Sequence, residues 1–220
     1  MNVTSPIILN KEKLYNRASA LALITIFYNF LEGMVSVYFG IDDETIALLG
    51  FGLDSFVEVM SGIGIWYMIR RLRQNGNEEP DTFERQALKV TGTAFYILAG
   101  GLVVTSIVNI YTGHKPETTL WGIIISVISI LTMWILISYK TKVGRMLNSS
   151  AILADAACTK VCMQLSIILL LSSLGYELTG FGGIDSIGAI GIAWFSFKEG
   201  RESFEKSRNL KCKCSCNCII

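Results

Sequence analysis

Two pairs of side chains that can bind metals lie four residues apart in the sequence. Asp54 and Glu58 form the acidic pair, and Cys158 and Cys162 form the thiol pair. Residues four apart project from the same face of a helix, so each pair presents two donor atoms together. Zinc accepts both carboxylate oxygen and thiolate sulfur, and paired thiols shift the preference toward softer ions such as Cd²⁺ or Cu⁺. We therefore expect these four residues to form a tetrahedral site for a divalent metal.

The elements that must position these pairs are hydrophobic segments long enough to cross a bilayer. The 220-residue chain is 51% hydrophobic and 17% charged, with three prolines and a mean hydropathy of +0.49. A bilayer core requires about 20 apolar residues per helix. The candidate segments are residues 18–39, 46–69, 89–111, 119–139, 150–174 and 181–200. The sequence predicts an all-α integral membrane protein with six transmembrane helices, and the last has the shortest apolar stretch.

Lysine and arginine are distributed very unequally between the two predicted membrane faces. Of the 19 cationic side chains, only Lys115 falls in the connections of one face, and only Lys160 falls within a span. Because positive loops are retained in the cytoplasm, both termini are expected to be cytoplasmic. We expect the protein to lie in the inner or plasma membrane. The net charge of +1 provides no overall basic field, so nucleic-acid binding is not expected.

The two pairs are expected to lie at the same depth in the membrane. At about 1.5 Å per residue, the two carboxylates lie roughly 12 and 18 Å below the outer end of the second span. By the same count, the two thiols lie roughly 12 and 18 Å above the inner end of the fifth span. Cysteine is also a small apolar residue that fits any core, which is the simpler interpretation of the thiols. The shared depth favours a common site.

Three further ionisable residues fall within the predicted spans, namely Glu32, Asp155 and Lys160. An intramembrane charge costs at least about 2.5 kcal/mol at a helix centre, so each is a possible accessory residue of the site. Helical geometry places Asp155 on the face of the thiol pair and turns Lys160 about 140° away. We expect Lys160 to form a structural ion pair with Glu32. The alternatives are that it lowers the negative charge of the site or supplies a counter-charge during proton exchange.

The residues around both pairs resemble the cation diffusion facilitator family, proton-coupled exporters of divalent transition metals with six transmembrane helices. The similar stretches are LGFGLDSFVE at 49–58 and LADAACTKVC at 153–162. In that family, side chains four apart on the second and fifth spans form the transport site. The resemblance covers roughly residues 14–205, and it implies the same four ligands by position. Asp185 and the Glu32-Gly33 pair also match residues found in members of the family.

The chain is expected to differ from typical family members in three respects. Cys158 and Cys162 replace a His and an Asp, which changes the expected metal preference. The cytoplasmic C-terminal domain of typical members, about a hundred residues long, is absent. There is no His-rich loop, and the single histidine, His114, is expected to be a solvated loop residue. We expect a short-branch member with a transmembrane domain at 1–205 and a Cys-rich cytoplasmic tail at 206–220.

Four cysteines alternate in the tail, at Cys212, Cys214, Cys216 and Cys218. Disulfides are not expected there, because thiols stay reduced on the cytoplasmic side. Alternating sulfurs in a flexible chain can converge on a soft metal, which makes a metal-handling tail the preferred interpretation. S-acylation near the membrane is the alternative.

Together these features predict a proton-coupled exporter of divalent transition metals, zinc first and cadmium or another soft metal second. It would work by alternating access as a homodimer, with no permanent cofactor and no enzymatic activity. Metal binding requires deprotonated carboxylates and thiols, so an inward proton gradient can drive release. The alternative is a non-transporting metal or redox sensor that acts through the tail. A thiol oxidoreductase is disfavoured because an i,i+4 disulfide would strain a helix, and a passive channel because such ligands would trap an ion.

Overall fold

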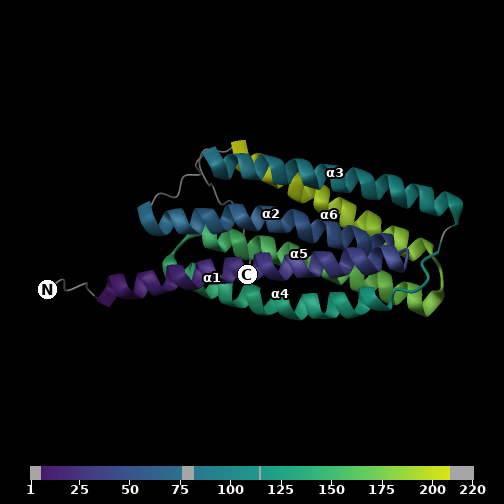
Figure 1. The fold of residues 1–220 in the computed structure, drawn as a ribbon, viewed down its shortest axis with the longest axis horizontal. Helices are drawn as coiled ribbons and strands as arrows, with labels where there is room; N and C mark the ends of the chain where they lie inside the picture. The colour runs from purple at the N-terminus through teal and green to yellow at the C-terminus, as the bar shows by residue number, and fades with distance from the viewer. Residues whose placement is uncertain (1–5, 76–81, 114, 209–220) are drawn as a thin grey trace.

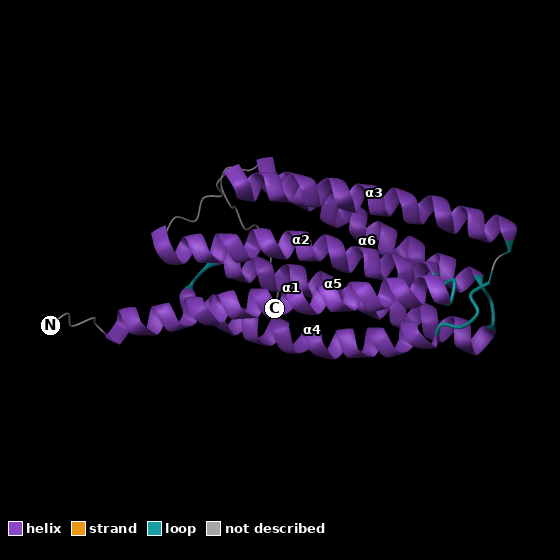
Figure 2. Ribbon diagram, in the orientation of Figure 1, coloured by secondary structure: helices purple, strands orange, loops and turns teal. Residues whose placement is uncertain are grey.

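The chain folds into a bundle of six long α-helices (Figure 1). The computed structural model describes residues 6–75, 82–113 and 115–208, and among these there is no strand (Figure 2). This confirms the all-helical prediction. The helices are α1 (Pro6–Asp42), α2 (Ile46–Asn75), α3 (Thr82–Thr112), α4 (Leu120–Leu147), α5 (Ser150–Thr179) and α6 (Gly183–Arg208).

The helices run alternately in opposite directions along the bundle. The connections after α1, α3 and α5 lie at one end, on the right in Figure 1, which we call the acidic end. Helices α2 and α4 end, and α3 and α5 begin, at the other end, which we call the basic end because most of the Lys and Arg residues of the described helices fall there. All helices except α5 extend past their predicted segments at the basic end, where charged turns continue the helix beyond its apolar part.

Four of the helices form a compact core, and the other two pack against it as a pair. Helices α1, α2, α4 and α5 contact one another, while α3 and α6 run together and pack on α2 and α5 (Figure 1). Glycines permit the closest approaches. A Cβ on Gly52 of α2 would lie 2.8 Å from the backbone nitrogen of Val37 on α1. A Cβ on Gly92 of α3 would lie 3.1 Å from the carbonyl oxygen of Gly200 on α6. Small residues therefore set these interhelical distances.

Polar side chains are buried inside this bundle together with an apolar core, and many large apolar side chains face outward. Large apolar residues are highly exposed, including Ile97 at 72% and Trp194 at 69%. By contrast, Ser129, Ser166 and Ser196 are completely buried. This arrangement suits a bundle surrounded by lipid, where polar groups must find partners within the protein. It agrees with a multi-pass membrane protein.

Five helices, α1 to α5, are long and apolar enough to cross a membrane. The sixth, α6, does not reach the same hydropathy over the described residues, because its second half carries charges such as Lys198, Glu199 and Arg201. Its 26 residues nevertheless span about 39 Å, and it runs beside α3 in the bundle. The sixth crossing and the cytoplasmic placement of the termini stay predictions.

Candidate metal transport site

Helices α2 and α5 bring one carboxylate and one thiol of the predicted site into contact. The thiol of Cys162 donates a hydrogen bond to Glu58 Oε1, between residues 104 positions apart in the chain. Cys162 is 7% exposed, and Glu58 is partly buried. The same thiol lies 3.3 Å from the carbonyl oxygen of Cys158. We call this contact the Glu58–Cys162 centre.

The other two predicted ligands lie one helical turn away in opposite directions. Asp54 is 2% exposed, and its Oδ1 accepts a hydrogen bond from Ser196 Oγ of α6 at 2.9 Å. Cys158 lies one turn toward the basic end and is partly buried. Among the described residues, no three His, Cys, Asp or Glu side chains are grouped closely enough to hold a metal ion. Of the four, Glu58 and Cys162 are joined across the two helices by a side-chain hydrogen bond.

Helix α1 supplies two polar residues beside this centre. Asn29 is 2% exposed, and its Nδ2 donates to Glu58 Oε2 at 3.0 Å. One turn further, Glu32 accepts hydrogen bonds from Tyr28 Oη at 2.9 Å and from Ser55 Oγ at 3.3 Å. The charge of Glu32 within an apolar segment indicates it as a possible accessory residue. Asn29 was missed, although an amide in the middle of an apolar segment is the signal that points to it.

The predicted ion pair between Lys160 and Glu32 is wrong. Lys160 is exposed, and the hydrogen bonds to Glu32 come from Tyr28 and Ser55. The physical reason lies in the helical geometry. The face of α5 that carries Cys162 points into the bundle, so a residue turned far from that face points outward. Lys160 therefore has no access to the interior position of Glu32.

A different lysine, Lys140 of α4, is buried, with 1% of its surface exposed. Its Nζ lies 2.9 Å from Asp155 Oδ1 and 2.9 Å from Thr159 Oγ1, both on α5. From the sequence, Lys140 is expected among the cytoplasmic cations, because the apolar segment 119–139 ends just before it. Helix α4 continues to Leu147, however, so this lysine remains within the packed bundle. Asp155, the proposed accessory residue, thus forms an ion pair with Lys140 of α4.

Two acidic residues cap neighbouring helices at the acidic end. Asp185 accepts hydrogen bonds from the backbone N–H groups of Ile46 at 2.8 Å and Ala47 at 3.3 Å, at the start of α2. Glu177 accepts one from the N–H of Thr119 at 2.6 Å, at the start of α4. Helix N-termini have free N–H groups and a positive dipole end, so carboxylates stabilise them. The resemblance singled out Asp185, and capping is what it does here.

Asp43, in the turn between α1 and α2, is a buried carboxylate in acidic surroundings. It is 7% exposed, and its Oδ2 has no hydrogen-bond partner among the described residues. Burial raises the pKa of Asp43, and the nearby carboxylates of Asp42, Glu117 and Glu177 raise it further. Compared with a free aspartate, the folded protein therefore keeps this side chain protonated to a higher pH.

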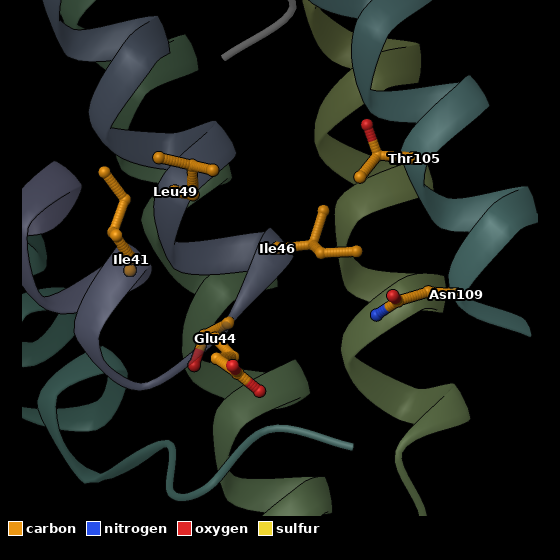
Figure 3. A pocket seen from close by; sticks show the side chains of 8 residues that line it. Ile41, Glu44, Ile46, Leu49, Thr105 and Asn109 are labelled. Atoms are coloured by element: carbon orange, nitrogen blue, oxygen red, sulfur yellow. The ribbon is translucent and has the colours of Figure 1, made fainter. Parts of the chain in front are cut away.

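A cavity of about 260 Å³ opens near this end, away from the Glu58–Cys162 centre. Figure 3 shows Ile41, Leu49 and Ile46 on one side of it and Thr105 and Asn109 of α3 on the other. Its surface is mainly apolar, and it contains none of the predicted ligands. His114 and the tail cysteines, Cys212, Cys214, Cys216 and Cys218, lie outside the described residues.

The comparison with protein families gives a match over most of the chain. The family model for the cation efflux transmembrane domain matches residues 20–210, which includes both motif stretches and most of the six helices. No curated protein matches the sequence significantly. A match over most of the chain, with both motif helices in contact, establishes the family: the chain belongs to the cation diffusion facilitators, the cation efflux family.

Proposed function

We propose that this membrane protein exports soft or borderline divalent cations, zinc first and cadmium second, in exchange for protons. Members of the cation efflux family are transporters rather than enzymes, which supports a divalent cation transporter here. The observation that supports the choice of metal is the Glu58–Cys162 centre, a thiol and a carboxylate from two helices in contact inside the bundle. Sulfur and oxygen together suit zinc and cadmium better than magnesium, calcium or manganese.

In the proposed mechanism, cargo and protons compete for the same ligands. The thiol of Cys162 carries its proton and donates it in a hydrogen bond to Glu58 when no cation is bound. A divalent cation that enters the centre displaces this proton, because the thiolate is the metal ligand. Asp54 and Cys158 join the ligand set when α2 and α5 shift, which requires Asp54 to leave Ser196. Protonation on the acidic side of the membrane then releases the cation.

The remaining parts of the proposal concern the placement of the bundle. We place the basic end in the cytoplasm, because cationic ends are retained there, and this makes both termini cytoplasmic. Helix α6 then forms the sixth crossing beside α3. The protein would act as a homodimer in the inner or plasma membrane, with lipid around the exposed apolar faces. For the Cys-rich tail, metal handling is the preferred interpretation and S-acylation is the alternative.

Zinc flux into proteoliposomes under a proton gradient tests this function. We expect Cys162→Ala, Glu58→Gln, Asp54→Ala and Cys158→Ala each to reduce zinc flux by about tenfold or more, since each removes a ligand. Two controls should retain flux. They are Glu205→Gln, at a side chain 56% exposed on α6, and Cys216→Ala in the tail. Unchanged flux in all four site variants would contradict the site.

Deletion of residues 212–220 separates transport from the sensor alternative. A transporter retains vesicle flux after this deletion, because its centre lies between α2 and α5. A sensor that acts through the tail loses every metal response instead. Absence of flux in the intact protein, with a metal response that vanishes on deletion, would favour the sensor.

A further inference from the structure

Asn29 carries a buried polar atom that the contacts at the centre leave unused. The residue is 2% exposed, and its Nδ2 donates to Glu58 Oε2 at 3.0 Å. Its Oδ1 is buried and has no hydrogen-bond partner in the described part of the chain. Burying a carbonyl oxygen without a partner is unfavourable, so such an atom calls for an explanation.

The geometry of the amide group connects this atom to the centre. Nδ2 and Oδ1 are attached to the same carbon, so a half-turn of the amide exchanges their positions. After that rotation, Oδ1 would occupy the place of Nδ2, about 3 Å from Glu58 Oε2. Two oxygens at that distance repel each other when the site is empty. A cation between them removes the repulsion and uses the lone pairs of both.

We propose that Asn29 is a further ligand for the transported cation. In the empty state its N–H holds Glu58 in place, and in the loaded state its amide turns over so that Oδ1 binds beside Glu58 and Cys162. This inference rests on the proposed function of the Glu58–Cys162 centre. It also fits the absence of any three His, Cys, Asp or Glu side chains grouped to hold a metal in the described residues, because the additional ligand is an amide.

A neutral oxygen ligand affects selectivity as well as affinity. It adds coordination without adding negative charge, which favours divalent ions that accept both oxygen and sulfur. A soft monovalent ion such as Ag⁺ depends mainly on thiolates and gains little from an amide oxygen. Asn29 is thus a specificity-determining residue, and its loss affects zinc more than silver.

The test compares zinc and silver binding by the purified full-length chain in detergent, with three variants. Asn29→Leu retains the branching of the side chain at Cγ and removes the amide, and we expect the zinc Kd to rise about tenfold or more with the silver Kd little changed. Asn29→Asp retains an oxygen ligand and loses the N–H donor, so zinc binding should be retained. The matched control, Asn109→Leu, replaces an asparagine at the separate cavity whose Nδ2 is unpartnered. It should bind both metals as the unmodified chain does.

Zinc-edge X-ray absorption gives a second readout that does not depend on affinity. We expect one more oxygen or nitrogen neighbour of zinc in the unmodified chain than in Asn29→Leu. Equal neighbour counts in the two proteins would overturn the inference. It would also be overturned if Asn29→Leu lost affinity equally for zinc and silver and Asn29→Asp did not retain zinc binding. That last pattern would mean that Asn29 only orients Glu58. If the unmodified chain binds no zinc, the proposed function itself fails, which is a distinguishable result.

Discussion

The buried contact between Lys140 and Asp155 should be among the strongest single determinants of stability in this bundle. Lys140 Nζ lies 2.9 Å from Asp155 Oδ1, and the two side chains are 1% and 7% exposed. Replacing Lys140 by Met leaves a carboxylate buried without its cation. Removing one partner of a buried pair costs about 3–5 kcal/mol. At about 1.4 kcal/mol per tenfold, this shifts the unfolding equilibrium by at least a hundredfold.

Helix α6 offers a matched comparison at the same distance. Arg201 Nε also lies 2.9 Å from the carboxylate of Glu205, but these side chains are 72% and 56% exposed. An exposed pair of this kind contributes about 0–1 kcal/mol. Arg201→Met should therefore have little effect, so the difference between the two variants isolates burial from distance.

The assay is reversible unfolding in detergent, followed by circular dichroism, for Lys140→Met, Asp155→Asn and the double variant. The double variant should recover most of the loss, because replacing both charges removes the unpaired group. The reasoning would be refuted if Lys140→Met were no more harmful than Arg201→Met. A double variant as unstable as Lys140→Met would refute it equally, since the two residues would then not be coupled.

Two further predictions concern the turn and the interface between α1 and α2. The raised pKa of Asp43 means that the folded state retains a proton that the unfolded chain releases. Stability from this group is therefore lost as pH rises from the ordinary Asp range through the raised value. Across that pH window, Asp43→Asn should therefore become more stable to heat than the unmodified chain, and Asp42→Asn should gain less. A difference in thermal stability between Asp43→Asn and the unmodified chain that does not change with pH would contradict this. Gly52→Ala places a Cβ 2.8 Å from the backbone of Val37 and should destabilise by about 1–3 kcal/mol in the same unfolding assay. Gly100→Ala, with nothing within 4 Å, should not, and equal effects would argue against close helix contact.

Several features of the fold could be predicted because they follow from the length and hydropathy of each segment. The apolar stretches 46–69 and 150–174 lie within α2 and α5, and their motif pairs fall where these helices meet. Counting depth from opposite ends of the two helices places the two pairs in one layer of the membrane, and Glu58 and Cys162 from these pairs are hydrogen-bonded. The ends of the helices were less predictable, because their charged last turns extend past the apolar stretches.

The partners of individual polar side chains could not be predicted from the sequence, because they depend on how the helices are rotated and paired. Lys140 resembled a cytoplasmic cation until α4 was seen to continue past it and pack on α5. Asn29 carries no charge, so a search for intramembrane ions passes over it, yet it contacts Glu58 directly. An ion pair with Glu32 is expected for Lys160 because of its charge. The angular position of Lys160 on α5, however, points its side chain away from the interior of the bundle.

The central claim is that the cargo binds between α2 and α5 at the Glu58–Cys162 centre. Equilibrium zinc binding to the purified protein lacking residues 212–220 tests it most directly, because removal of the tail leaves Cys158 and Cys162 as its only thiols. We predict that this protein binds zinc and releases protons as it does so, and that Glu58→Gln and Cys162→Ala abolish both. Zinc stoichiometry near zero before any substitution, or binding unchanged in both variants, would contradict the account.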